Sequence, residues 1–331
     1  MPFDVFRRQR AGGSAGRKLL LFVASDIHGS EMCWRKFINS ARQFNADVLL
    51  LNGDVAGKIL VPAERRGSGW LCWFRGQPLE VSMEAELEEI FDKARQQGQY
   101  PYRASDGEIE QLRTNQEYLE TVFRRVIRES VADWVALAGE RLKGTRTRLL
   151  VMPGNDDPDD VAEVVAQSAV AENPEGRVID LDEEHQLIAL GYSNITPWDT
   201  PRELEEPEMR ARLETDFDAV RDPGLTIGAI HCPPFDSGLD TAPLLDSAFT
   251  VQTESGQVRM VPVGSTAVRE VIEHYQPLLS VHGHIHESSG VRTLGNTVAI
   301  NPGSEYGDGT LRAALLSVSG RTVIGHQFIH G

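Results

Sequence analysis

Four short apolar segments, each followed at once by a cluster of polar residues, constrain the fold of this 331-residue chain most. They are residues 18–25, 47–51, 148–152 and 225–230. Continuous apolar runs of this length are typical of strands buried on both faces. Residues 32–44, between the first two segments, have helical spacing of apolar side chains, and a strand, helix, strand succession predicts a parallel pair. We therefore expect an α/β fold in which each strand ends in polar residues.

Residues 57–147 interrupt this succession, and we predict that they form a helical insertion. Apolar side chains of residues 82–97 share one helical face. Ser105 and Glu108 form a capping box before a near-heptad apolar pattern that runs to about Leu142. Because such a face must be buried, we expect a lid or a self-association element that makes the protein a homo-oligomer. The alternative is that the insertion packs back on its own sheet.

The second half of the chain is predicted to be mixed. Helices are expected at residues 203–220 and 265–275, and a hairpin at residues 249–261. Strands are expected at residues 278–281, 297–300, 311–318 and 322–328, where glycine-rich turns favour antiparallel pairing. Together these segments predict one domain over residues 18–331, preceded by a flexible basic tail over residues 1–17.

Charge and cysteine content narrow the class of protein. Thirty-three Lys and Arg against 49 Asp and Glu give a net charge of −16, which repels polyanions and makes a nucleic-acid partner unfavourable. Three separated cysteines without a CxxC pair predict neither a disulfide framework nor a thiolate zinc site. The apolar run at residues 19–24 is too short for a signal peptide or a membrane span. We expect a cytoplasmic protein without a membrane partner, acting on small molecules.

Five polar clusters follow the predicted strands, and the carboxyl ends of strands are where open α/β sheets place their sites. The clusters supply carboxylate, amide and imidazole donors that suit divalent metals: Asp26 and His28, Asp54, Asn155 with Asp156 and Asp157, His231, and His284 with His286. Each cluster alone also has a structural explanation, such as a turn aspartate or a surface histidine. Asp157 before Pro158 is interpreted as a helix N-cap.

Other candidate residues are assigned structural or supporting places. His282 ends its strand and is a candidate to support the ligands from behind, whereas Cys232 is interpreted as a buried neighbour. The remaining histidines are interpreted as core or surface residues: His185, His274, His326 and His330.

The order of the five clusters (D-x-H, GD, GN-x-D, H, GH-x-H) resembles the signature of the calcineurin-like metallophosphoesterase superfamily. The resemblance extends from Lys18 to about Phe328 without the insertion, and residues 231–234 and 301–304 also resemble segments of its smaller bacterial and archaeal phosphoesterases. It implies a four-layer α/β/β/α sandwich with a dinuclear metal centre. By position, Asp26, His28 and His286 would hold one metal, Asn155, His231 and His284 the other, and Asp54 would bridge.

The residues themselves support the same chemistry. Two divalent cations outweigh the charge of Asp26 and Asp54, so the centre would attract a phosphate ester despite the acidic chain. Paired metals acidify a shared water, and the bridging hydroxide would be the nucleophile of an in-line displacement. Imidazole and oxygen donors suit Mn, which we expect first, and also Fe, Zn or Ni.

Asp156 is a departure from the family pattern, because many members carry His at this position. The family His is thought to stabilise the transition state or to protonate the leaving group. We therefore predict a phosphodiesterase acting on a small phosphate ester, with Asn155 and Asp156 as candidate catalytic residues. The alternatives are a metal-free or weakly active interaction scaffold on the same fold, and a nuclease.

Overall fold

The computed structural model describes residues 18–246 and 248–331, so the predicted basic tail lies outside the described residues. One six-stranded sheet has the order β22-β21-β1-β2-β7-β8. Its strands β1, β2, β7 and β8 are parallel, and β21 runs antiparallel to both β1 and β22. The bounds are β1 Leu19–Ala24, β2 Val48–Asn52, β7 Arg148–Met152, β8 Ala171–Glu172, β21 Arg312–Ser319 and β22 Thr322–His330.

A second six-stranded sheet has the order β19-β20-β18-β13-β10-β9. Strands β10, β13, β18 and β20 are parallel, whereas the edge strands β9 and β19 are antiparallel. The bounds are β9 Ile179–Asp180, β10 Gln186–Leu190, β13 Thr226–Ile230, β18 Leu279–Val281, β19 Gly290–Leu294 and β20 Thr297–Asn301. The prediction that β18 and β20 pair antiparallel is wrong. Strand β20 pairs parallel with β18 and antiparallel with the edge strand β19, so it lies between these two strands.

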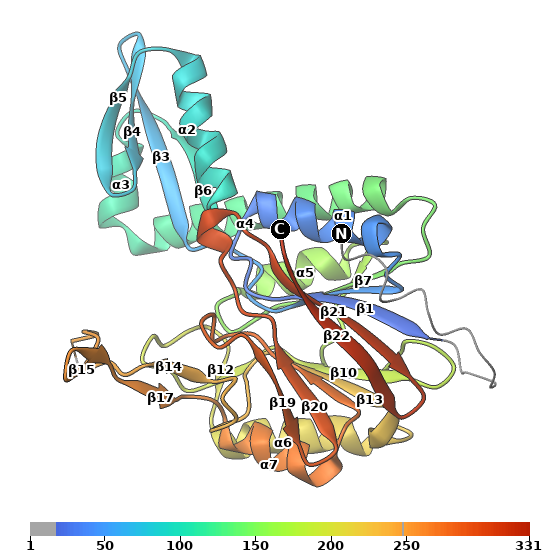
Figure 1. Ribbon diagram of the computed structural model, residues 1–331. Helices are drawn as coiled ribbons and strands as arrows, with labels where there is room; N and C mark the ends of the chain where they lie inside the picture. The colour runs from blue at the N-terminus through green and yellow to red at the C-terminus, as the bar shows by residue number, and fades with distance from the viewer. Residues whose placement is uncertain (1–17, 247) are drawn as a thin grey trace.

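The alternation of side chains along β1 shows how the layers pack. Phe22 and Ala24 join a core with helices α1 (Glu31–Phe44), α4 (Gln116–Leu142) and α5 (Asp159–Ala166). Leu21 and Val23 point the other way and pack against residues of the second sheet. The outer face of that sheet is covered by α6 (Glu206–Asp218) and α7 (Thr266–Tyr275). Helices therefore lie outside both sheets (Figure 1), and the expected α/β class is confirmed.

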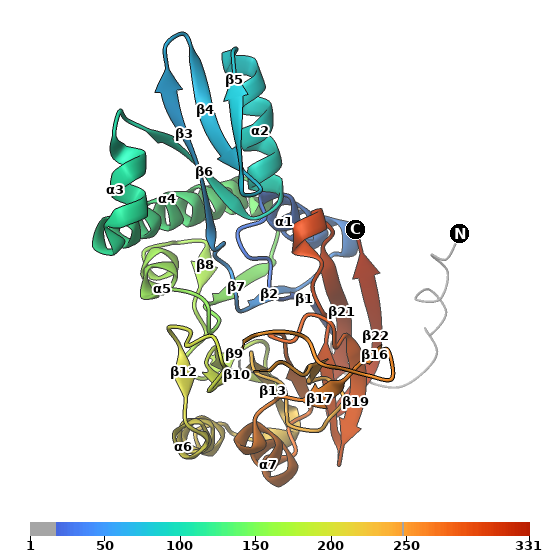
Figure 2. The same cartoon turned by 90° about the vertical axis from the view of Figure 1, so that its left-hand side faces the viewer.

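The segment predicted as a helical insertion contains a sheet as well as helices. Its four strands have the order β5-β4-β3-β6, and α2 covers them with a separate small core. The bounds are β3 Ile59–Arg66, β4 Gly69–Phe74, β5 Gln77–Val81, α2 Glu84–Gln96, β6 Gln99–Ala104 and α3 Glu108–Thr114. The purely helical prediction is wrong, because these strands carry charged residues that hide their alternation. Figures 1 and 2 show this unit standing off the two large sheets.

The long predicted helix is real but interrupted. Asn115 ends α3 and caps α4 by accepting a hydrogen bond from the Tyr118 amide, 3.1 Å away. Beyond it, Ile127, Val131 and Trp134 of α4 join the core of the first sheet. Much of the apolar face that suggested self-association is thus covered within the chain itself.

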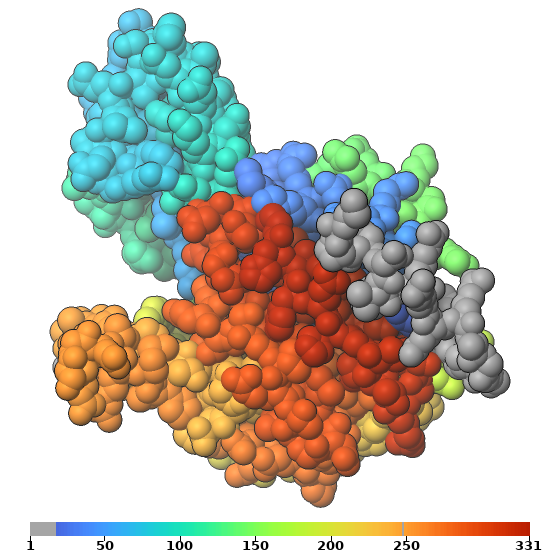
Figure 3. All heavy atoms as spheres, viewed as in Figure 1, coloured from blue at the N-terminus to red at the C-terminus, as the bar shows by residue number. Residues whose placement is uncertain are grey.

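A two-stranded arm projects from the second sheet, over residues 241–262 (Figure 1). It holds the predicted hairpin, which turns at Ser255 and Gly256. The bounds are β14 Thr241–Pro243, β15 Thr253–Glu254, β16 Gln257–Val258 and β17 Met260–Pro262; nearby, β11 Ser193–Asn194 pairs with β12 Glu203–Leu204. Figure 3 shows a notch between this arm and the insertion. Within the described residues, every helix is too short or too polar to cross a membrane.

Candidate metal centre

Every residue that the sequence nominated as a metal ligand lies at one place, beyond the carboxyl ends of the strands. Asp26 and His28 follow β1, and Asp54 follows β2. Asn155 follows β7, His231 follows β13, and the pair His284 and His286 follows β18. The two sheets pack face to face, and strands of both end at this place and deliver side chains to it.

The first group of donor atoms consists of Asp26, His28 and His286, whose ligand atoms all lie within 4.8 Å of one another. The His286 Nε2 lies 3.4 Å from the Asp26 Oδ1 and 3.1 Å from the His28 Nε2. Two imidazole nitrogens this close require a proton or a cation between them. This is the set that the resemblance assigns to one metal.

The second group consists of Asp54, His231 and His284, again within 4.8 Å. The His231 Nε2 lies 3.5 Å from the Asp54 Oδ1 and 3.1 Å from the Asn155 Oδ1. The other ring nitrogen, Nδ1, donates to the Asn52 carbonyl at 2.7 Å, which leaves Nε2 free to bind a metal. A backbone carbonyl therefore fixes the tautomer that a ligand needs.

Asp54 faces both groups. Its Oδ1 is on the side of His231, whereas its Oδ2 lies 3.6 Å from the His28 Nε2 of the first group. Oδ1 also accepts a hydrogen bond from the Asp156 amide at 3.0 Å, which fixes the carboxylate. Asp54 thus lies between the two groups of donor atoms.

Two glycines of the motifs are needed because the ligands lie against the backbone. A Cβ on Gly154 would lie 2.1 Å from the Asp54 Oδ1, and one on Gly283 would lie 2.5 Å from the Asp26 Oδ2. Because glycine has no side chain, the loops that contain these two residues can pack directly against the carboxylates.

Four of the candidate ligands have left-handed backbone conformations: Asp26 at φ 56°, His28 at φ 40°, Asp54 at φ 51° and His284 at φ 64°. A residue other than glycine in this region costs roughly 1–3 kcal/mol, and such strain is concentrated at functional sites. The surrounding sheets must hold this strain, which supports a functional role for these loops.

Burial and charge set the protonation of the donors in the metal-free chain. Burial acts to raise the pKa of Asp26, but the hydrogen bond with His286 and the charge of His231 outweigh it and bring the pKa to about 2. Burial lowers the pKa of His28 and of His284 to about 4. Burial also acts to lower the pKa of His231, but Asp54 raises it to about 10. The carboxylates of Asp54 and Asp26 thus favour a positive charge at His231.

The donor set fits divalent metal ions. The His28 Nδ1 is buried and has no hydrogen-bond partner among the described residues. This nitrogen lies 4.0 Å from the Asp156 Oδ2, whereas the other ring nitrogen, Nε2, faces His286 and Asp54. The fit therefore rests on the carboxylate and imidazole atoms gathered within 4.8 Å, which are donors that divalent metals accept.

Three residues of the site were not found from the sequence. The Lys58 ammonium forms an ion pair with the Asp156 carboxylate at the mouth of the centre. The Tyr306 ring packs on His28, with the ring centroids 4.6 Å apart. Ser304 donates a hydrogen bond to the Asp26 carbonyl at 2.6 Å. Only Ser304 lies in a segment that the sequence had singled out, because the other two come from loops without a motif.

The helix-cap interpretation of Asp157 is wrong. The N-cap of α5 is Pro158, and the buried Asp157 carboxylate instead accepts from the amides of Val55, Ala56 and Gly154, at 2.7 to 2.9 Å. It joins the loop after β2 to the loop after β7. Burial and the charge of Asp54 raise the pKa of Asp157 to about 7.

The structure also places the supporting candidates. The His282 Nδ1 lies 2.9 Å from the Ile230 carbonyl and 3.1 Å from the Cys232 carbonyl, so this ring braces the backbone on both sides of His231. Cys232 is buried with its sulfur 3.1 Å from the Asn194 Oδ1, outside the donor groups. His185 is also buried and binds Asp182 far from the site.

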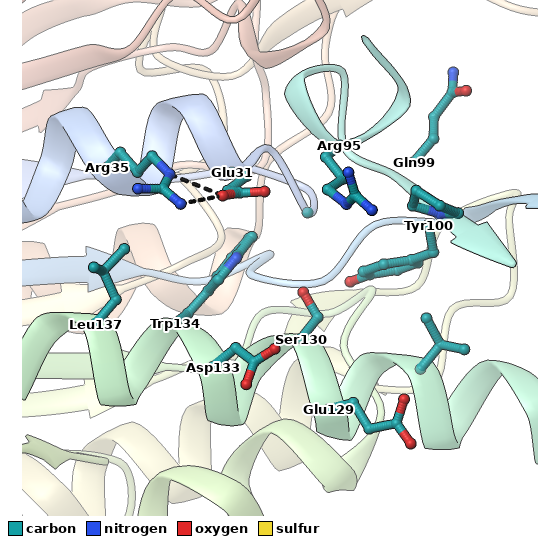
Figure 4. Close-up of a pocket in the computed structure, with 13 residues that line it drawn as sticks. Glu31, Arg35, Arg95, Gln99, Tyr100, Glu129, Ser130, Asp133, Trp134 and Leu137 are labelled. Atoms are coloured by element: carbon teal, nitrogen blue, oxygen red, sulfur yellow. Dashed lines mark hydrogen bonds and ion pairs between the residues drawn. The ribbon is translucent and has the colours of Figure 1, made fainter. Parts of the chain in front are cut away.

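A groove of about 430 Å³ lies behind the centre, between the insertion and the core. It begins at Gly29, next to His28, and Tyr100, Trp134 and Glu31 contribute to its walls (Figure 4). The Tyr100 hydroxyl accepts from the Gly57 amide at 2.9 Å, and the Ser30 hydroxyl donates to the Gln96 carbonyl at 2.7 Å. The insertion is therefore bonded to the loops that carry His28 and Asp54.

Comparisons with known proteins agree with this arrangement at the level of the fold. A scan against protein-family models finds no match. The uncharacterized protein MJ1162 of Methanocaldococcus jannaschii is 28% identical over 156 residues, which cover 46% of this chain and 63% of that protein. The chain thus spans less than two thirds of the length of this relative.

Solved structures match over nearly the whole chain. One crystal structure aligns with a TM-score of 0.55 at 13% identity, and TT1561 of Thermus thermophilus with 0.52 at 12%; each alignment covers 95% of this chain and 99% of the other. A novel archaeal phosphodiesterase and Yfce, a phosphoesterase from E. coli, overlap less, with TM-scores of 0.35 and 0.29, at 9% and 12% identity. The first covers 95% of this chain and 100% of its own, the second 93% and 98%. The chain resembles the calcineurin-like metallophosphoesterases. The resemblance rests on the order of the motifs, and the structure gathers those motifs at one edge.

Proposed function

We propose that this chain is a metal-dependent phosphoester hydrolase with two divalent metal ions. The observation that carries the proposal is the pair of donor groups with Asp54 between them, since its Oδ1 faces His231 and its Oδ2 faces His28. Asp26, His28 and His286 would hold one ion, and Asn155, His231 and His284 the other. We also propose that residues 18–331 are one catalytic domain of the four-layer sandwich type, interrupted by the insertion at residues 57–147.

The ions would supply an acidified shared water and would clamp the oxygens of an in-line phosphoryl displacement. The chain itself orients the side chains that would bind the ions. Asn52 holds the His231 tautomer, and the Asp156 amide fixes Asp54. Imidazole and oxygen donors without thiolate favour Mn, with Fe, Zn and Ni as the alternatives.

We propose that diesters are the preferred substrates, because a carboxylate stands where many family members have His. Asp156 is 10% exposed at the mouth, with its Oδ2 4.0 Å from the His28 Nδ1. Burial and the charge of Asp54 raise the pKa of Asp156 to about 6, although Lys58 acts to lower it. At neutral pH the group is therefore mainly ionised, and a monoester dianion is repelled more than a diester monoanion.

The decisive experiment measures metal content and activity together. Protein purified with Mn should contain two metal ions per chain and hydrolyse a phosphate diester. Asp54→Asn and His231→Ala should each lose metal and lower kcat/KM by at least about a hundredfold, since second-sphere changes alone cost 10- to 100-fold.

His185→Ala is the matched control, because this buried histidine lies outside the donor groups. It should keep both metals. Full metal content and full activity in both ligand variants would contradict the proposal, and a protein that binds no metal would favour an interaction scaffold.

A further inference from the structure

Two exposed aromatic rings contact each other, and one of them stands on a loop that is bonded to Asn155 of the candidate centre. Trp198 is 56% exposed and Phe249 is 57% exposed, and their ring centroids lie 5.6 Å apart at an interplanar angle of 79°. We call Trp198 and Phe249 the aromatic pair. They come from two different segments, the loop before β12 and the arm. Rings of this size are normally buried, so two of them in contact and both open to solvent need an explanation.

The loop that carries Trp198 is bonded directly to the centre. The Asn155 side-chain amide donates to the Thr200 hydroxyl at 3.0 Å, and the Arg202 amide donates to the Asn155 carbonyl at 3.1 Å. Trp198 is two residues from Thr200, so its Cα lies within about 7 Å of the Thr200 Cα. The loop that carries Trp198 is therefore attached to a candidate ligand of the centre.

The same loop is held in shape by one carboxylate. Glu203 accepts hydrogen bonds from the Thr200 amide at 2.9 Å and from the Thr200 hydroxyl at 2.7 Å, and also from the amide and hydroxyl of Thr196. Hydrogen bonds to a charged acceptor are the strong kind. Both sides of Trp198 are thus fixed, and the ring is presented on a closed turn.

Phe249 is presented by a second closed turn. The Asp246 Oδ1 accepts from the amides of Ala248 at 2.8 Å and Thr250 at 2.9 Å, and Phe249 itself has a φ of 60°. Left-handed backbone is an outlier for a bulky residue and is tolerated where the surroundings impose it. The turn holds this strain while its side chain stays in solvent.

Exposed apolar surface is concentrated at this place. Six of the eleven most exposed large apolar side chains of the described residues belong to this loop and to the arm: Ile195, Trp198, Phe249, Val251, Val258 and Met260. The arm borders the notch that Figure 3 shows beside the insertion. An apolar wall next to a phosphate-binding centre suits an ester with a flat apolar group.

We propose that a nucleobase of the substrate stacks on one ring of the aromatic pair and contacts the other ring with its edge, so that the site takes small nucleoside phosphate esters. This inference rests on the proposed function. A single pair of rings offers one stacking position, whereas binding of a polynucleotide uses a basic groove and successive aromatics, and the net charge of −16 opposes it.

The test compares two diesters that differ only in the base, the methyl ester of adenosine 5′-monophosphate and that of ribose 5-phosphate. Trp198→Ala and Phe249→Ala should each lower kcat/KM for the adenosine ester about tenfold through KM, because base stacking is worth roughly 1–3 kcal/mol. Hydrolysis of the ribose ester should not change. Ile324→Ala, which removes an exposed apolar side chain of β22 away from this loop and the arm, should change neither.

Equilibrium dialysis with adenosine 5′-monophosphate and ribose 5-phosphate separates this inference from the proposed function. Tighter binding of the adenosine compound that depends on both rings supports the inference even if no ester is hydrolysed. Equal hydrolysis and equal binding of the two compounds by the unaltered protein would overturn it and leave the hydrolase intact. Light scattering tests whether the rings instead contact a second copy of the chain. If the unaltered protein is a dimer and Trp198→Ala is a monomer with the same substrate preference, the nucleobase inference is overturned.

Discussion

Substrate choice is expected to depend on the charge of Lys58 as well as on that of Asp156, because the two side chains form an ion pair. Asp156 is nearly buried and Lys58 is half exposed, so the ammonium can turn toward a bound phosphate while the carboxylate stays. Substituting the two residues should therefore move selectivity in opposite directions, because one removes a negative charge beside the substrate and the other a positive charge.

Asp156→His should raise the turnover of a phosphate monoester relative to a diester by about tenfold, since it replaces a repelling charge by a proton donor. Asp156→Asn should raise the ratio less, and Lys58→Gln should lower it. Steady-state kinetics on p-nitrophenyl phosphate and its bis ester under saturating Mn would measure this. An unaltered protein that already prefers the monoester would show that the argument is mistaken.

At the scale of elements, the hydrogen bonds of the Glu108 carboxylate at the start of α3 are the clearest contacts that acid should weaken. Its carboxylate accepts from the Tyr118 hydroxyl at 2.6 Å, from the Ser105 amide at 2.7 Å and from the Tyr102 hydroxyl. Burial acts to raise the pKa of Glu108, but these hydrogen bonds outweigh it and bring the pKa from 4.5 to about 2. Because the folded pKa lies below the unfolded one, the stabilisation is present above pH 4.5 and is lost as the pH falls towards 2.

We predict that Glu108→Gln destabilises the start of α3 by roughly 1–2 kcal/mol at pH 7, and that the difference from the unaltered protein shrinks between pH 4.5 and 3. Hydrogen exchange of the backbone amides of β6 and α3 would measure this local loss of stability. Glu110→Gln, an exposed glutamate of the same helix, is the control and should show no such pH dependence. A constant difference across this range would argue against the assignment.

The elements that sequence patterns predicted share one physical property. Strands β1, β2, β7 and β13 are buried on both faces, so each is a continuous apolar run, and their bounds agree with the prediction to within about two residues. Strands β3 to β6 expose one face and carry charged residues such as Glu64 and Arg66, which hid them. Strand β10 is just as apolar but lacks a polar cluster at its end, and it was missed.

The candidate ligands were recognisable because each stands in a short motif directly after a strand. Lys58 and Tyr306 belong to the same site but follow no motif, and only the folded chain brings them to His28 and Asp156. Asp157 shows the opposite case. Its local sequence indicates a helix cap, but its carboxylate instead accepts hydrogen bonds from three backbone amides, two of them in the loop after β2 and one in the loop after β7.

At the scale of the whole molecule, the insertion divides into two parts with different attachments. Helix α4 belongs to the core of the first sheet, whereas residues 59–104 have a small core of their own. The second part meets the site through a tight contact: a Cβ on Gly57 would lie 2.0 Å from the Gly98 carbonyl, so the segment after α2 lies directly on the loop after Asp54. A lid or interface role therefore falls to residues 59–104 alone.

We predict that replacing residues 60–97 by a short glycine and serine linker alters substrate preference or oligomeric state while the catalytic domain stays folded. The linker is feasible because Ile59 and Gln99 are direct partners in parallel strands, about 4.8 Å apart, and Gly98 and Tyr100 stay in place. Removing a wall of the notch should raise the relative rate for bulky diesters by about tenfold or more if the unit is a lid, since it would no longer position or exclude substrate. If the unit is an interface, light scattering should instead show a smaller assembly. Circular dichroism and metal content serve as controls for folding. An unchanged oligomeric state together with an unchanged preference for substrate size would exclude both roles and leave the insertion as a structural appendage packed on its own sheet.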